Sequence, residues 1–238
     1  MAELFITAFG GFQGVSRNPT EDLLEDVVGR CKDSKTNDLW KLVGHTVLPV
    51  AAKEVETWLK DTLYGKILSN NYSHPVVVHM GVDKEATEYR LETYAANEAS
   101  FRCPDQAGWQ PSQESIDDSH PFASKLLTDL PVSVIAGLLK AQGLPVEQSF
   151  DAGRFVCNWT YYHSLRLALE TRPRVHVVFV HVPPLAVMPL EEQKEVMWHV
   201  LAEVAGAVVG GPEKGGVEDA LGGVDARRLP SLLRALRR

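Results

Sequence analysis

Cys157 has the surroundings best suited to nucleophilic chemistry in this sequence. A turn at Gly153 precedes it, and the residues that follow predict a helix beginning near the cysteine. The apolar positions of that helix recur at helical spacing, at Phe155, Trp159, Tyr162, Leu165 and Leu169. A thiol at a helix N-terminus meets unpaired backbone N–H groups and the positive end of the helix dipole, and both favour the thiolate. A lone cysteine is more often an inert core residue than a nucleophile. A catalytic role for Cys157 therefore depends on a partner group elsewhere in the chain.

A histidine closes the next predicted strand. Residues 175–182 form an apolar run that ends at Pro183, which is typical of a strand buried on both faces of a sheet. In open α/β sheets the site lies beyond the carboxyl ends of the strands, so His181 and Cys157 are expected to converge. His176 is five residues from His181 and should face the opposite side of the sheet, which argues against a shared metal.

The rest of the chain alternates strand and helix patterns in the manner of parallel βαβ units. Strands are predicted at 4–9, 41–48, 75–81 and 146–150, and helices at 18–31, 51–67, 131–143 and 190–209. With 238 residues and 45% hydrophobic content, we expect one α/β domain over residues 1–209, a three-layer α/β/α sandwich around a mostly parallel twisted sheet. Residues 210–238 are expected to form a Gly-rich linker and a basic C-terminal tail.

The amino-acid composition and net charge of the chain limit the kinds of binding partner and location to expect. The net charge of −7 argues against a nucleic-acid partner, and no apolar segment approaches the length of a membrane span. The N-terminus lacks the basic region of a secretory signal, and the three cysteines include no CxxC pair. We therefore expect a cytoplasmic protein with reduced thiols, without a metal or other cofactor, and either monomeric or homo-oligomeric.

Several segments together carry a recognisable pattern. They are residues 7–12 (Thr-Ala-Phe-Gly-Gly-Phe), 18–19 (Asn-Pro), 48–50 (Leu-Pro-Val), 153–158 (Gly-Arg-Phe-Val-Cys-Asn) and 179–183 (Phe-Val-His-Val-Pro). In order and approximate spacing these segments resemble the type I pyroglutamyl peptidases, cysteine peptidases that remove an N-terminal pyroglutamyl residue from peptides. The similarity spans about residues 3–205, and around Cys157 and His181 it looks closest to the eukaryotic members.

The resemblance implies roles for particular residues. Cys157 would be the nucleophile and His181 the acid and base, with Glu92 orienting the imidazole. From the residues alone several acids are available for the last role, namely Asp83, Glu85, Glu88, Glu92 and Asp105, and the resemblance selects Glu92. The Cys157 backbone N–H and the Arg102 side chain would stabilise the oxyanion.

The resemblance also implies a small apolar slot for an uncharged lactam ring, so the expected partners are peptides with N-terminal pyroglutamate. The implied lining residues are Phe9, Phe12, Asn18, Val82, Cys103, Phe155 and Val156. Ala8, Gly11 and Gln13 replace a glycine, a proline and a glycine of the family, which predicts a looser opening loop.

Two other interpretations stay open from the sequence. The chain could be another Cys-His-acid hydrolase that acts on a different amide or lactam. Alternatively, the altered opening loop could have closed the slot and left a non-enzymatic interaction module anchored by the basic tail.

Overall fold

The computed structural model describes residues 1–12, 17–33, 38–172 and 174–210. The linker and tail expected at residues 210–238 lie outside these ranges, apart from Gly210 at the end of the last helix.

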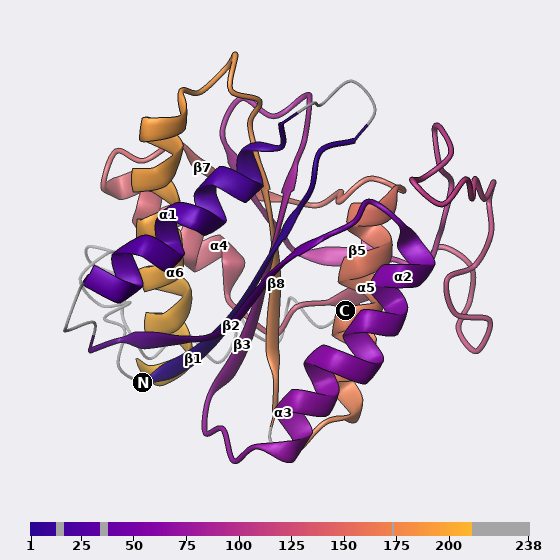
Figure 1. The fold of residues 1–238 in the computed structure, drawn as a ribbon, viewed down its shortest axis with the longest axis horizontal. Coiled ribbons are helices and arrows are strands. Elements are labelled where there is room, and N and C mark those ends of the chain that lie inside the picture. The colour runs from indigo at the N-terminus through magenta and orange to yellow at the C-terminus, as the bar shows by residue number, and fades with distance from the viewer. Residues whose placement is uncertain (13–16, 34–37, 173, 211–238) are drawn as a thin grey trace, which may run out of the picture.

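A six-stranded twisted sheet runs through the middle of the molecule (Figure 1). In spatial order its strands are β2 (Trp40–Leu48), β1 (Ala2–Phe9), β3 (Pro75–Val82), β8 (His176–Val182), β4 (Tyr89–Glu92) and β7 (Val146–Ser149). The first four strands are mutually parallel, whereas β4 runs antiparallel to β8 and parallel to β7. The predicted mostly parallel sheet is therefore confirmed, with its last two strands reversed.

Helices cover both faces of the sheet, which confirms the predicted three-layer sandwich (Figure 1). On one face lie α1 (Pro19–Asp33), α4 (Val132–Ala141) and α6 (Leu190–Gly210). On the other lie α5 (Val156–Glu170) and a continuous helical segment made of α2 (Ala52–Trp58), the π-helical turn η1 (Leu59–Tyr64) and α3 (Gly65–Ser69). Among the described residues, no helix has the length and apolar character needed to cross a membrane.

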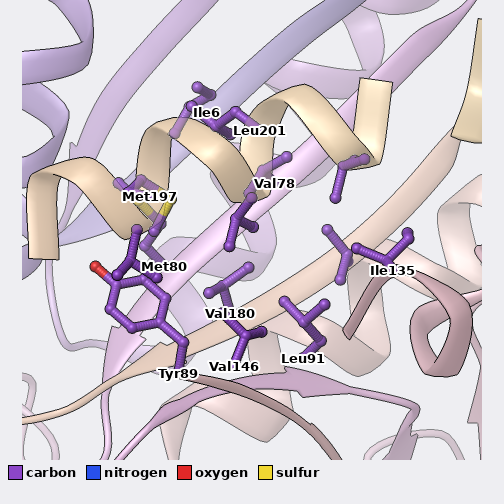
Figure 2. Close-up of a cluster of buried hydrophobic side chains, with 14 of the residues drawn as sticks. Ile6, Val78, Met80, Tyr89, Leu91, Ile135, Val146, Val180, Met197 and Leu201 are labelled. Atoms are coloured by element: carbon purple, nitrogen blue, oxygen red, sulfur yellow. The ribbon is translucent and has the colours of Figure 1, made fainter. Parts of the chain in front are cut away.

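Alternate residues of the central strands pack against the helices on opposite faces of the sheet. Both sets of side chains are therefore apolar, which explains why the sequences of these strands are continuous apolar runs. Val78 and Val180 lie beneath α6, in the same cluster as Met197 (Figure 2). Their neighbours Val77 and Phe179 belong to the other layer, under α5. The catalytic candidate His181 follows this alternation and lies on the α5 side, next to Phe179.

His79, inside β3, is fully buried as a core histidine. Its Nδ1 lies 2.7 Å from Thr7 Oγ1, and burial lowers the pKa of the ring to about 3. The ring is therefore neutral and bonded within the sheet.

The long polar segment at 83–124 contains more regular structure than its composition suggests. It includes β4 and β5 (Tyr94–Ala96), and β5 pairs with β6 (Lys125–Leu127) in a separate two-stranded antiparallel sheet. The strand expected to reach Phe150 ends at Ser149, and the Phe150 side chain is 57% exposed.

Leu165 and Leu169 test how far the apolar face of α5 extends. Leu165 is 5% exposed, but Leu169, expected on the same face, is 63% exposed in the last turn of the helix. Helical spacing fixes which face is apolar, but not where the helix passes beyond the layer beneath it. We expect Leu165→Ala to lower the free energy of unfolding by about 2–5 kcal/mol, and Leu169→Ala to change it by less than about 0.5 kcal/mol. Urea denaturation of both variants measures this, and equal losses would contradict the described packing.

Candidate active site

The helix that carries Cys157 begins as the sequence predicts. Gly153 turns the chain with a φ of +75°, a region that favours glycine, and the extended residue Phe155 precedes the first helical residue, Val156. The first intrahelical bond runs from the Trp159 N–H to the Phe155 carbonyl at 3.1 Å. The N–H of Cys157 is thus one of the unpaired donors at the positive end of the helix.

The cysteine sulfur occupies space that a glycine of β3 leaves open. A Cβ added to Gly81 would lie 3.0 Å from the Cys157 Sγ and 2.9 Å from the Phe179 ring. Gly81 is also the register partner of His181 on β8. Sequence reasoning missed Gly81, although a glycine in an otherwise apolar strand is a signal for close approach.

Glu92 and His181 meet where β4 crosses β8 in the antiparallel direction. Arg90 lies opposite His181 in this pairing, so Glu92, two residues further on, lies on the same face and diagonal to the histidine. The Glu92 Oε1 is 2.8 Å from the His181 Nδ1. The carboxylate is 0% exposed and the histidine 5% exposed, so water screens this pair little.

The other side of the imidazole faces the thiol. Cys157 and His181 line one wide cleft, so the thiol and the ring share the same space. Burial by itself lowers the pKa of His181, but the hydrogen bonds and negative charges of Cys157 and Glu92 outweigh it and raise the pKa to about 10. The site therefore favours an imidazolium held between a sulfur and a carboxylate.

Backbone contacts hold Glu92 at this depth. The Tyr161 hydroxyl donates to the Glu92 carbonyl at 2.9 Å, and the Thr93 N–H donates to the Ser149 carbonyl at 2.9 Å. The Glu92 Oε2 has no hydrogen-bond partner among the described residues. The carboxylate therefore has its one described partner in His181, which fixes the ring's orientation.

A narrow cavity of about 50 Å³ opens beside Cys157. Of the slot residues named from the sequence, the described lining includes Phe9, Phe12, Asn18, Val82, Phe155 and Val156. Cys103 is not among the lining residues, although its neighbour Arg102 is, with its guanidinium carbon 5.4 Å from the centre of the Phe155 ring. Proximity along the chain does not decide which of two loop neighbours faces a cavity.

Two amides brace the opening loop. The Asn18 side chain donates to the Gly10 carbonyl at 3.2 Å and accepts the Thr20 N–H at 3.1 Å. The Gln106 side chain donates to the Gly11 carbonyl at 2.9 Å and accepts the Val50 N–H at 2.9 Å. Gln106 thus holds the loop at Gly11, the residue that replaces the family's proline. Gln13 lies outside the described residues.

Two further polar residues organise the segment around Arg102. The Asn158 side chain accepts the Ala96 N–H at 2.8 Å and donates to the Ala96 carbonyl at 2.9 Å, which links α5 to β5. Asp105 accepts the Ala52 N–H at 2.9 Å at the start of α2, so this acid has a structural role. Sequence reasoning missed Gln106 and Asn158 because their partners are backbone groups distant in the sequence.

The model of the family described as pyroglutamyl peptidase matches residues 2–207. The chain belongs to the pyroglutamyl peptidase family. It is accordingly a cysteine peptidase of the pyroglutamyl-peptidase I type, and it acts on peptides. The resemblance of the sequence to this family is thereby confirmed.

Relatives and solved structures agree with this assignment. The chain is 30% identical over 183 residues to a pyrrolidone-carboxylate peptidase of Thermococcus litoralis, covering 77% of each chain. It is 32% identical over 184 residues to one from Staphylococcus aureus strain Newman, covering 76% of this chain and 78% of the relative.

Among solved structures, the pyrrolidone carboxyl peptidase of Fervidobacterium islandicum AW-1 superposes with a TM-score of 0.72 at 25% identity, covering 85% of this chain and 97% of that one. The Thermococcus litoralis enzyme superposes with a TM-score of 0.75 at 24% identity over 91% of this chain and 99% of the other, which supports the fold.

The space over Gly81 gives a direct test of the site geometry. In Gly81→Ala the new methyl group would push against both the Cys157 sulfur and the Phe179 ring, so we expect alkylation of Cys157 by iodoacetamide to slow about tenfold or more. Mass spectrometry of the alkylated peptide measures this rate. Gly137→Ala is the matched control, since an added Cβ there meets no atom within 4 Å. Unchanged alkylation in Gly81→Ala would contradict the described position of the sulfur.

Proposed function

We propose that this peptidase hydrolyses the amide bond that follows an N-terminal pyroglutamyl residue. The observation that carries the proposal is the position of Cys157, which lines both the narrow slot and the wide cleft and shares the cleft with His181. A substrate with its first residue in the slot would present its first carbonyl to the sulfur and extend its remaining chain into the cleft.

The chemistry of the slot suits a lactam ring. Pyroglutamate has no α-ammonium group, so an aminopeptidase-like carboxylate anchor would be useless. The described lining of the slot contains no carboxylate and includes the aromatic rings of Phe9, Phe12 and Phe155. Such a slot rejects a free amino terminus because the buried ammonium would find no partner.

Acylation would use the pair formed by Cys157 and His181. The thiolate attacks the pyroglutamyl carbonyl carbon, a C–S bond forms, and the negative charge moves to the carbonyl oxygen. As the intermediate collapses, the C–N bond breaks and the imidazolium gives its proton to the leaving nitrogen. The shortened peptide departs and leaves a thioester.

In deacylation the proton moves towards His181 instead of away from it. The neutral His181 takes a proton from water as the oxygen attacks the thioester, and the C–S bond then breaks to release pyroglutamate and the thiolate. Glu92 keeps the same ring nitrogen oriented throughout, since its Oε1 binds Nδ1 at 2.8 Å. In both steps the Cys157 N–H and the Arg102 guanidinium are the proposed donors to the oxyanion.

The proposed chemistry needs a reduced sulfur, so we also propose a reducing location such as the cytoplasm. Cys31, Cys103 and Cys157 all carry free thiols, which supports this placement.

Replacing the sulfur tests the proposal directly. We expect Cys157→Ala to lose at least about 10³-fold in kcat/KM on pyroglutamyl-amidomethylcoumarin, because no other group can form the acyl-enzyme. Cys31→Ser should retain activity, because the Cys31 side chain packs on the face of the sheet opposite to that of Cys157. A panel of other aminoacyl-amidomethylcoumarins separates this function from that of a different Cys-His-acid hydrolase. Equal turnover across the panel, or none on the pyroglutamyl reporter, would overturn the proposal.

The pH profile tests the role of Glu92. With two negative partners, the imidazolium should persist until the pH approaches about 10, so activity should fall only in strongly alkaline solution. Glu92→Gln removes one of these charges, which lowers the pKa of His181 and should move the alkaline limb of kcat/KM to lower pH. The measurement is kcat/KM from pH 6 to pH 10.5. If the alkaline limb lies at the same pH in both proteins, Glu92 does not raise the pKa of His181.

A further inference from the structure

The two cavities beside Cys157 share a border. Val82, Lys84, Arg102 and Phe155 line both the slot and the wide cleft, as Cys157 does. On the proposed function, the slot takes the pyroglutamyl ring and the cleft takes the leaving peptide. The shared residues therefore border the substrate residue directly after the bond that breaks.

Most charges in the cleft cancel one another. Arg90 pairs with Glu147 at 2.9 Å and also with Asp83. Arg154 pairs with Asp151 at 2.7 Å. These three acids share two arginines, and Arg154 also pairs with Glu98 at 2.8 Å, so each of these acids has a cationic partner but the group keeps a net negative charge.

The two cations at the shared border are different. Lys84 and Arg102 form no ion pair with any described residue, and both side chains are exposed to the cavities they line. The remaining acid, Glu85, lines the wide cleft but is not among the described residues that line the slot. The border next to Cys157 therefore carries two cations that have no direct acidic partner among the described residues.

A defined turn presents Lys84. The Asp83 side chain accepts the Glu85 N–H at 3.0 Å, and the Asp83 carbonyl accepts the Ala86 N–H at 3.2 Å. Because Asp83 is itself held by Arg90, the backbone on both sides of Lys84 is fixed to the cleft wall.

We infer that Lys84 is a specificity-determining residue, which with Arg102 favours a carboxylate on the substrate residue directly after pyroglutamate. That carboxylate has two possible sources: the free C-terminus of a pyroglutamyl dipeptide, or an acidic side chain in a longer peptide. Since the pair would be exposed, the gain in kcat/KM is about two- to fivefold at low salt, and it falls as salt screens the charges.

The test compares matched substrates on the full chain. One pair is pyroglutamyl-alanine and its C-terminal amide; the other is pyroglutamyl-glutamate amide and pyroglutamyl-glutamine amide. For at least one of the two pairs, the ratio of kcat/KM for the acid to that for the neutral partner should fall at least about twofold in Lys84→Gln, and Lys84→Arg should restore it. Raising the salt from 20 mM to 500 mM should lower the wild-type ratio towards that of the variant.

Lys32→Gln is the charge-matched control. Lys32 lies in the last turn of α1 and lines neither cavity, so it changes the net charge without changing the border. Its ratios should equal those of the wild type.

The pattern across the two pairs identifies the source of the carboxylate. A fall for the dipeptide pair alone supports recognition of the C-terminus, and a fall for the other pair alone supports recognition of an acidic side chain. If Lys84→Gln leaves both ratios unchanged while the neutral amides are still cleaved, the inference is overturned and the proposed function stands. If the wild type cleaves none of the four substrates, the proposed function fails, and the inference with it.

Discussion

The buried contact between Glu92 and His181 is the constraint on which the site depends. A carboxylate without solvent exposure is costly unless a positive partner compensates it, and the described partner here is one imidazole at 2.8 Å. The contact exists because β4 runs against β8. Glu92 follows Arg90 by two residues along β4. It therefore lies on the same face of the sheet as His181, further from the carboxyl end of β8, and contacts the ring from there. The imidazole is thereby left with one free side, which faces Cys157.

Packing around the sulfur is as strict as the electrostatics. The helix start brings Cys157 over β3, and the missing side chain of Gly81 sets how closely it approaches. Phe179 fills the adjacent space, with its ring centre 4.7 Å from that of His181. The position of the nucleophile thus follows from one absent side chain and one large one, both on central strands that the core holds in place.

Much of this arrangement was predictable from the sequence. The alternation of apolar runs and helical patterns indicated the layered fold, and the turn before Cys157 and the strand ending at His181 indicated the reacting pair. Glu92 could not be chosen from several nearby acids without the family resemblance, because the choice depends on the direction of β4. That strand has only four residues in a polar segment, too few for periodicity to register. Gln106 and Asn158 act on backbone groups that only the folded chain brings near them.

The central sheet also separates two apolar clusters, one on each of its faces. The cluster under α1, α4 and α6 includes Met197 and Leu201, whereas the cluster under α5 contains Phe9, Val156 and Phe179 beside the cavities. Most substitutions in the first cluster act on the active site through the intervening strands, with Val82, which packs against this cluster and lines both cavities, as a direct contact. Evolution can therefore adjust the heat resistance of such a protein and its choice of substrate through largely separate sets of residues, with little trade-off between the two.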